Sequence, residues 1–257
     1  MESINRIIDK LENKKEYFNA VDELHSEFET LYITVRKLQN RLYSDEQLLQ
    51  LPGLPEGHPL YYEWLCRKIT SEKLLHYIAN KKIALNILEV GCGNGWLANK
   101  LAQIDNSIVA AIDINKTELQ QAARVFDRKN LSFIYGDIRE NIFPDDKFDI
   151  IVFAASIQYF PFFDEIINTA LLKLNKQGEI HIIDSHFYKK AEQNKARERS
   201  YEYFSALGFP EMTDYYYHHK IDDLRPFHYK KLYDPTALKN KILKNKNPFP
   251  WICIFNR

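Results

Sequence analysis

Short continuous apolar runs recur through the middle of the chain, separated by amphipathic stretches. Residues 87–90, 107–112 and 131–135 are such runs, dominated by Ile, Leu, Val, Ala and Phe, as expected for strands that are buried on both faces. The stretch 116–127 carries its apolar residues at helical spacing. This alternation of buried strands and helices predicts an α/β fold with a mainly parallel sheet.

The first 80 residues lack strand patterning and are predicted to be helical. Apolar positions within 4–11 follow an i, i+3, i+4, i+7 spacing, and a second apolar stripe runs through 18–38. The proline- and glycine-containing segment 52–55 breaks the pattern before a further helical segment begins. We therefore divide the chain into a helical extension, residues 1–80, and a sheet-forming domain, residues 81–257.

The apolar run 87–90 leads into three alternate glycines, Gly91, Gly93 and Gly95. Glycine lets the backbone turn tightly and approach a ligand that a Cβ atom would hold off. The dinucleotide fingerprint G-x-G-x-x-G needs its third glycine at position 96, where this chain has Trp96. The loop is therefore expected to bind a nucleoside cofactor other than NAD.

Two aspartates follow the next two strands. Asp113 ends the run 107–112 about 20 residues beyond the glycine loop, the interval at which a βαβ unit places a carboxylate against ribose hydroxyls. Asp137 follows the run 131–135. Either aspartate alone could instead cap a helix or turn. Together with the glycine loop they favour a ligand, because open α/β sheets bind ligands at the carboxyl ends of their strands.

The pattern E-x-G-x-G-x-G at 89–95 resembles motif I of the class I S-adenosylmethionine-dependent methyltransferases. Gly-Asp-Ile at 136–138 resembles the adenine-contacting corner of that family, and 148–160 resembles its fourth strand with the following loop. The resemblance covers residues 81–190, leaves 191–257 for a closing helix and strands, and implies S-adenosylmethionine as the cofactor. The residues implied in cofactor binding are Glu89, Gly91, Cys92, Gly93, Gly95, Asp113, Ile114, Asp137, Ile138, Ala154 and Ser156.

The same resemblance implies a Rossmann-like fold: a seven-stranded, mostly parallel sheet with helices on both faces and a helical N-terminal cap. Residues 178–184 are expected to form the fifth strand, and a charged helix should follow over 189–207. Apolar runs at 229–233 and 251–255, with a short helix at 235–243 between them, would complete the sheet. The last strand runs antiparallel in this family.

The helical extension is expected to lie over the cofactor mouth and shape the acceptor pocket, as in related methyltransferases. A dimer interface or a cover for the sheet edge would use the same apolar stripes, so these alternatives stay open. Aromatic side chains with polar tips suit a ligand pocket. Those expected to line it are Tyr61, Tyr62, Trp64 and Tyr159.

Methyl transfer from a sulfonium needs mainly alignment of the acceptor atom and exclusion of water. A hydroxyl acceptor must also lose a proton, which calls for a general base with a pKa near neutrality, usually a histidine. The candidates are His186, His218 and His219. A single histidine is often a hydrogen-bonded structural residue, so geometry must decide among them. The spacing of acidic and amide residues reveals no ligand set for a hard cation, and no metal is expected.

Lys and Arg balance Asp and Glu at 35 each, so no overall field attracts nucleic acid or an anionic membrane. Cys66, Cys92 and Cys253 form neither a metal-binding pair nor an even disulfide set, which fits a reducing compartment. The sequence shows no signal-peptide pattern, and no apolar run approaches the roughly 18 residues of a membrane span. A cytoplasmic location is expected.

We therefore predict a methyltransferase that acts on a small-molecule or sugar-like metabolite through an oxygen or nitrogen acceptor. The chain reads Ala-Ala-Ser-Ile at 154–157, where an Asn-Pro-Pro-Tyr or Asp-Pro-Pro-Tyr signature would indicate nucleic-acid methylation; protein acceptors stay open. The alternative is a cofactor-binding module without chemistry, such as a regulatory partner of another enzyme. A monomer or homodimer without nucleic-acid or membrane partners is expected.

Overall fold

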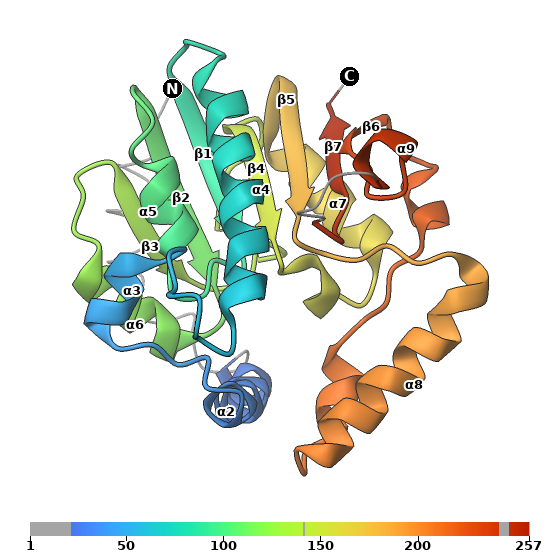
Figure 1. Cartoon of the computed structure of the whole chain (residues 1–257). Coiled ribbons are helices and arrows are strands. Elements are labelled where there is room, and N and C mark those ends of the chain that lie inside the picture. Colours follow the sequence, from blue (N-terminus) through green and yellow to red (C-terminus); the bar gives the residue numbers. More distant parts are fainter. Residues whose placement is uncertain (1–21, 141, 242–246, 257) are drawn as a thin grey trace.

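A seven-stranded sheet forms the centre of the molecule (Figure 1). The computed structural model describes residues 22–140, 142–241 and 247–256. In chain order the strands are β1 (Leu85–Val90), β2 (Ser107–Asp113), β3 (Leu131–Tyr135), β4 (Phe148–Ala154), β5 (Leu174–Ile183), β6 (Tyr229–Tyr233) and β7 (Trp251–Phe255). Their order across the sheet is β3-β2-β1-β4-β5-β7-β6. The first five are parallel, and β7 runs antiparallel to both β5 and β6. The predicted fold class is confirmed.

The five parallel strands are buried because helices cover both faces of the sheet. Successive residues of β1 alternate between two cores: Leu85 and Ile87 face one, and Leu88 and Val90 face the other. The first core is closed by α3 (Asp45–Gln50), α4 (Tyr61–Ala79), α5 (Trp96–Leu101) and α6 (Lys116–Val125), and the second by α7 (Phe163–Lys173). This double cover explains why the strands are continuous apolar runs rather than alternating ones.

A third, smaller core joins segments from the two ends of the chain. Helix α2 (Asp22–Leu38) packs against α8 (Lys190–Ala206) and the 3-10 segment η2 (Pro210–Tyr215) through Val35, Phe204 and Met212. The side chain of Gln39 donates a hydrogen bond to the hydroxyl of Tyr203 at 2.8 Å. We call α2, α8 and η2 together the roof; in Figure 1 its helices lie at one end of the strands.

Three short elements complete the described part of the chain. They are η1 (Ile157–Tyr159), η3 (Ile221–Leu224) and α9 (Leu238–Lys241). The helix predicted at 235–243 thus begins three residues later, at Leu238, and its last two residues lie outside the described residues. The apolar stripe predicted at 4–11 also lies outside the described residues. Within the described residues, no helix is long and apolar enough to cross a membrane.

Gly95 offers a direct test of how the glycine loop packs on the sheet. Gly95 and Gly208 both have positive φ, at 72° and 87°, but a Cβ on Gly95 would lie 2.5 Å from the ring of Phe133, whereas a Cβ on Gly208 meets nothing within 4 Å. Gly208→Ala should therefore lower the free energy of unfolding by about 1–2 kcal/mol through backbone strain alone. Gly95→Ala should cost a further 1–3 kcal/mol or so, because overpacking adds to that strain.

Urea denaturation of the two variants measures this difference. Equal losses of stability would show that the ring of Phe133 can move aside without cost, and the close helix–strand packing proposed for Gly95 would then be wrong.

Candidate functional site

The glycine loop after β1 is held in a conformation that only glycine adopts without strain. Gly91, Gly93 and Gly95 have φ values of 71°, 52° and 72°. A Cβ on Gly91 would lie 2.5 Å from the Cβ of Ser156, and a Cβ on Gly93 would lie 3.2 Å from Oε2 of Glu118. The first two glycines therefore keep the loop in close contact with its neighbours at the carboxyl edge of the sheet.

Loops from four strands enclose a cavity of about 340 Å³ at this edge. We call it the glycine-loop cavity. Its walls come from the ends of β1, β2, β3 and β4, and the roof contributes aromatic side chains from α2 and η2. The residues that define it include Phe28, Tyr32, Gly91, Gly93, Asp113, Ile114, Asp137, Ile138, Ser156, Tyr159 and Tyr215. The cavity therefore collects most of the residues that the sequence implicates in cofactor binding.

Asp113 connects the end of β2 to the glycine loop. Its Oδ2 accepts a hydrogen bond from the backbone N–H of Gly93 at 2.6 Å, and its Oδ1 accepts one from the N–H of Asn115 at 2.8 Å. Burial raises the pKa of this carboxyl to about 6. Each oxygen has a second lone pair, so Asp113 can hold the loop and still accept hydrogen bonds from a ligand hydroxyl.

Asp137 makes a local ion pair beside the same cavity. Its side chain is buried and binds the guanidinium of Arg139. The Nε atom of Arg139 lies 3.0 Å from each of the two carboxylate oxygens. The backbone N–H of Arg139 also donates to Oδ1 at 2.8 Å. These bonds fix the turn after β3 and place Ile138, which is buried, against the cavity.

A smaller cavity of about 70 Å³ lies beneath the glycine loop. We call it the inner cavity; Glu89, Cys92, Gly93, Ala154 and Trp64 line it together with Glu118, Tyr32 and three arginines, Arg36, Arg41 and Arg67. Glu89 is 2% exposed, and its Oε2 has no hydrogen-bond partner within the described part of the chain. Burial, with Asp113 nearby, raises its pKa well above the ordinary range. A positively charged ligand group would satisfy this carboxylate.

A third cavity, of about 360 Å³, opens between the roof and the ends of β4 and β5. We call it the arginine cavity, because Arg36, Arg41, Arg67 and Arg199 line it. Glu63 is paired with Arg41 and, at 2.9 Å, with Arg67. Tyr32 and Ala155 border all three cavities, so the three spaces meet at these two residues.

The comparisons with known proteins agree with this geometry. A family model described as a methyltransferase domain matches residues 81–237. The chain belongs to the class I S-adenosylmethionine-dependent methyltransferases. Solved structures share the fold: the YcgJ protein from Bacillus subtilis has a TM-score of 0.54 at 14% identity, covering 72% of this chain and 99% of its own. A Galdieria sulphuraria protein named as a candidate sarcosine dimethylglycine methyltransferase has a TM-score of 0.56 at 11% identity, covering 89% and 97%.

Curated relatives match shorter regions. Malonyl-[acyl-carrier protein] O-methyltransferase 1 from Ilyobacter polytropus is 36% identical over 95 residues, which are 36% of this chain and 35% of that protein. Release factor glutamine methyltransferase from Lactococcus lactis is 33% identical over 149 residues, 54% of each chain. The matched regions thus span about a third to a half of these relatives. The cofactor of the methyltransferase is S-adenosylmethionine.

The structure places the three candidate histidines in different surroundings. His218 is buried, and its Nε2 lies 2.9 Å from the hydroxyl of Ser200. His219 is also buried, with its Nε2 3.0 Å from the backbone oxygen of Ile157. Neither borders the three cavities. His186 lines the arginine cavity and is the one of the three candidates that borders any of these cavities.

Some of the other predicted site residues line a cavity, and others do not. Tyr159 lines the glycine-loop and arginine cavities, and Trp64 lines the inner cavity. Tyr61 and Tyr62 border none of the three, and Tyr62 is 79% exposed. Ser156 borders the glycine-loop cavity while its hydroxyl donates to the backbone oxygen of Val90 at 2.6 Å. Its polar group thus fixes β4 to β1.

Sequence reasoning missed several charged residues of the site. Arg36, Glu118 and Asp184 line the cavities, yet each looks like an ordinary polar position on a helix or after a strand. Asp184 did carry a signal, because it ends the fifth parallel strand at the same edge as Asp113. Arg36 on α2 carried no such sequence signal, since its position depends on how the roof packs over the sheet.

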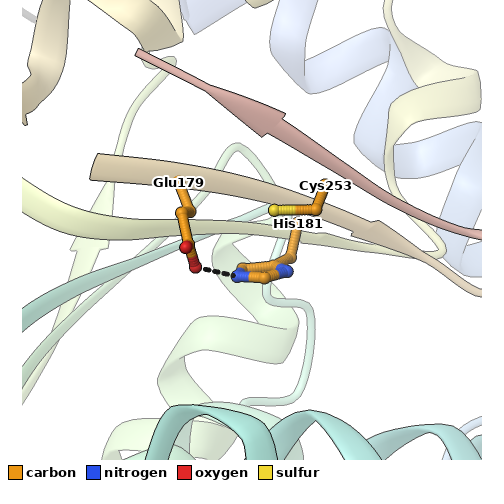
Figure 2. Close-up of side chains that lie close together, drawn as sticks. All are labelled: Glu179, His181 and Cys253. Carbon is orange, nitrogen blue, oxygen red and sulfur yellow. Dashed lines mark hydrogen bonds and ion pairs between the residues drawn. The ribbon is translucent and has the colours of Figure 1, made fainter. Parts of the chain in front are cut away.

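A separate buried cluster lies on β5 and β7, away from the cavities (Figure 2). Glu179, His181 and Cys253 place their ligand atoms within 4.8 Å of one another. The indole N–H of Trp251 donates to Nδ1 of His181 at 3.1 Å, so the ring proton sits on Nε2 and donates to Glu179 at 3.2 Å. Lys81 pairs with Glu179 at 2.9 Å. Both histidine nitrogens are used, so the cluster is a structural hydrogen-bond network rather than a ligand set.

Replacing Asp113 tests its double role. Asp113→Ala removes the acceptor of the Gly93 N–H together with any bond to the ribose, and hydrogen bonds to charged groups are worth roughly 1.5–3 kcal/mol each. The dissociation constant for S-adenosylhomocysteine should therefore rise by about 10- to 100-fold or more, as measured by calorimetric titration. Asp105→Ala, an exposed change before β2, serves as the matched control and should bind normally. Unchanged affinity of Asp113→Ala would contradict the role.

Glu118 should make the ligand-free methyltransferase less stable as pH rises. Burial raises its folded-state pKa from 4.5 to about 7, so its contribution is fully present below pH 4.5 and is lost as pH rises through about 7. Glu118→Gln should therefore be more stable than the parent by about 3 kcal/mol at pH 8 and by close to nothing near pH 4.

Urea denaturation across this pH range is the measurement. Glu202→Gln, an exposed change on α8, is the control and should shift stability by no more than about 0.5 kcal/mol at either pH. A difference between Glu118→Gln and the parent that stays constant with pH would show that Glu118 titrates normally in the folded protein.

Proposed function

We propose that the methyltransferase transfers the methyl group to an oxygen or nitrogen atom of a small, anionic metabolite. The arginine cavity carries this proposal: it is a chamber of about 360 Å³ that adjoins the glycine-loop and inner cavities at Tyr32 and Ala155. A chamber of this size lies in the range typical of small-molecule sites.

The charge of the chamber favours an anion. Arg41 and Arg67 share the carboxylate of Glu63, whereas Arg36 and Arg199 have no ion pair within 4.0 Å in the described part of the chain. The guanidinium of Arg36 lies 4.7 Å from the ring centroid of Tyr32 at the junction of the cavities. A guanidinium presents a planar fork of donors that matches a carboxylate or phosphate.

The proposed cofactor placement follows from the polar groups beside the glycine loop. Glu89 would bind the ammonium group of the methionine portion, because its orphaned oxygen faces a cavity too small for more than a slender chain. Asp113 would bind the ribose hydroxyls, and the turn Asp137–Ile138 would contact the adenine. When bound, the cofactor supplies an activated methyl group; the protein orients the acceptor beside it and excludes water.

The relatives do not point to a single kind of methyl acceptor. They are named for malonyl-[acyl-carrier protein], a release factor glutamine and a sterol carbon, so the chamber itself is the better guide. A cytoplasmic location, a monomeric or homodimeric state and the absence of nucleic-acid and membrane partners stay predictions.

Labelled methyl transfer to a panel of small acceptors tests the proposal. The panel pairs carboxylates and phosphates that carry a hydroxyl or amine with neutral analogues such as their amides or alcohols. We expect turnover with the anionic members. Arg36→Gln should raise KM for such an acceptor by about 10- to 100-fold, the equivalent of one charge-assisted hydrogen bond. Because Arg36 also lines the inner cavity, S-adenosylhomocysteine affinity is measured in parallel.

Arg225→Gln is the matched control, because Arg225 is exposed and paired with Asp222 at 2.9 Å, away from the chamber. It should behave as the parent. Preference for the neutral analogues, or an Arg36→Gln protein with parental KM, would overturn the anionic assignment while leaving the methyltransferase activity itself in place.

A further inference from the structure

Asp184 is a buried carboxylate whose position in the arginine cavity is not explained by the fold. It directly follows β5, is 7% exposed and lines the cavity. Its Oδ1 has no hydrogen-bond partner among the residues that the structure describes. A buried acceptor left in this way costs free energy, so a partner beyond the described residues, such as a bound ligand, is expected at this atom.

Asp184 and its neighbour Ala155 share an uncommon backbone conformation. Asp184 has a φ of 54°, and Ala155, at the end of the neighbouring strand β4, has a φ of 52°. Residues with a Cβ rarely adopt this left-handed conformation, which persists only where the surrounding structure enforces it. Both residues border the arginine cavity, and Ala155 also borders the two cavities assigned to the cofactor. Asp184 thus lies on the acceptor side of the junction.

The groups facing Asp184 leave it ionisable near neutrality. Burial raises its pKa to about 6, while the charge of Arg67 and hydrogen bonding to Thr70 and Asn247 lower it, and Glu63 raises it. The other charged or titratable groups of this cavity come from several elements. They are Glu63 and Arg67 on α4, Tyr32 and Arg36 on α2, Arg41 after α2, Tyr159 on η1, His186 and Tyr188 after β5, Arg199 and Tyr203 on α8, and Tyr216 after η2, with Cys66 of α4 nearby. Thr70 accepts a hydrogen bond from Asn247 and donates its own to the backbone oxygen of Cys66 at 3.0 Å. Oδ1 of Asp184 has no partner among the described residues.

We propose that Asp184 is the general base of the methyl transfer and takes the proton of the acceptor O–H or N–H on its Oδ1. This inference rests on the proposed function, because it assigns the proton of the same acceptor. As the acceptor oxygen or nitrogen forms its bond to the methyl carbon, the sulfur keeps the electron pair of the broken C–S bond, and the acceptor proton passes to Asp184. Solvent removes that proton once the product has left.

The same inference excludes an acceptor whose reactive atom carries no proton. A carboxylate oxygen can accept a methyl group without a base, so the anionic group held by the arginines and the reactive group beside Asp184 are different parts of the acceptor. The acceptor class is therefore a small molecule with an anionic group at one end and a hydroxyl or amine at the other.

His186 is the rival base within the cavity. It is exposed, its ring lies 4.6 Å from that of Phe249, and burial of part of the ring together with Arg199 lowers its pKa. It follows Asp184 by two residues and lines the same space. Replacing each residue in turn therefore separates the two assignments.

The test compares Asp184→Asn, Asp184→Glu and His186→Gln on the best acceptor of the panel. Asp184→Asn should lower kcat by about 100-fold or more, the usual contribution of a general base, while S-adenosylhomocysteine affinity and KM stay within about threefold. The kcat of the parent should rise as pH increases through about 6. This rise should be absent from Asp184→Asn. Asp184→Glu should recover part of the rate, and His186→Gln should lose less than about tenfold.

A measurement without any acceptor keeps this inference separate from the proposed function. Aspartate labelled with ¹³C at its carboxyl group allows Asp184 to be titrated by NMR in the S-adenosylhomocysteine complex, with Asp184→Asn identifying its signal. A midpoint near 6 is expected. Asp164→Asn, an exposed change on α7, is the control and should alter neither rate nor this signal.

Three results would overturn the proposal. Parental kcat in Asp184→Asn, or a 100-fold loss in His186→Gln alone, would remove Asp184 as the base. A titration midpoint below about 4, the ordinary value, would show a carboxylate already stabilised by its internal donors. If no panel member is methylated, the proposed function fails on its own, and the NMR midpoint still decides whether Asp184 can act as a base at neutral pH.

Discussion

The hydrogen bond from the backbone of Gly93 to the carboxylate of Asp113 is the interaction on which the rest of the site depends. Parallel pairing brings the ends of β1 and β2 to one edge of the sheet, and this bond then fixes the glycine loop above that edge. Gly91 and Gly93 border both the glycine-loop cavity and the inner cavity. A shift of the loop would therefore change both spaces at once.

The same edge gathers carboxyl groups that water would hydrate far better. Glu89, Asp113, Glu118 and Asp184 all have a raised pKa because burial penalises their charge. None of them is needed to complete the sheet, whose cores are apolar. The apolar cores must offset the free energy that burying these groups costs, and such exceptions to local rules are typical of functional sites.

The sheet and the glycine loop could be predicted because their signals are local: continuous apolar runs, alternate glycines and a carboxylate at a fixed interval. The arginine cavity could not be predicted, because Arg36 and Asp184 lie far apart in the sequence and are brought to one cavity only by the packing of the roof. His218 and His219 could not be told apart from His186 as candidate bases, since nothing in their spacing reveals that Ser200 and a backbone oxygen lie within hydrogen-bonding distance of their rings. The division into an extension and a domain stays a prediction.

The roof has a consequence for how this methyltransferase could change over evolution. It is built from α2 and from α8 with η2, which precede and follow the strands of the cofactor-binding half and are joined by a small core of their own. Its side of the arginine cavity can therefore be altered by substitutions that leave β1 to β4 untouched. A lineage could reshape that cavity through roof residues that border it and not the glycine-loop cavity, such as Phe204 and Met212, while Phe28 and Tyr215, which wall the glycine-loop cavity, are kept.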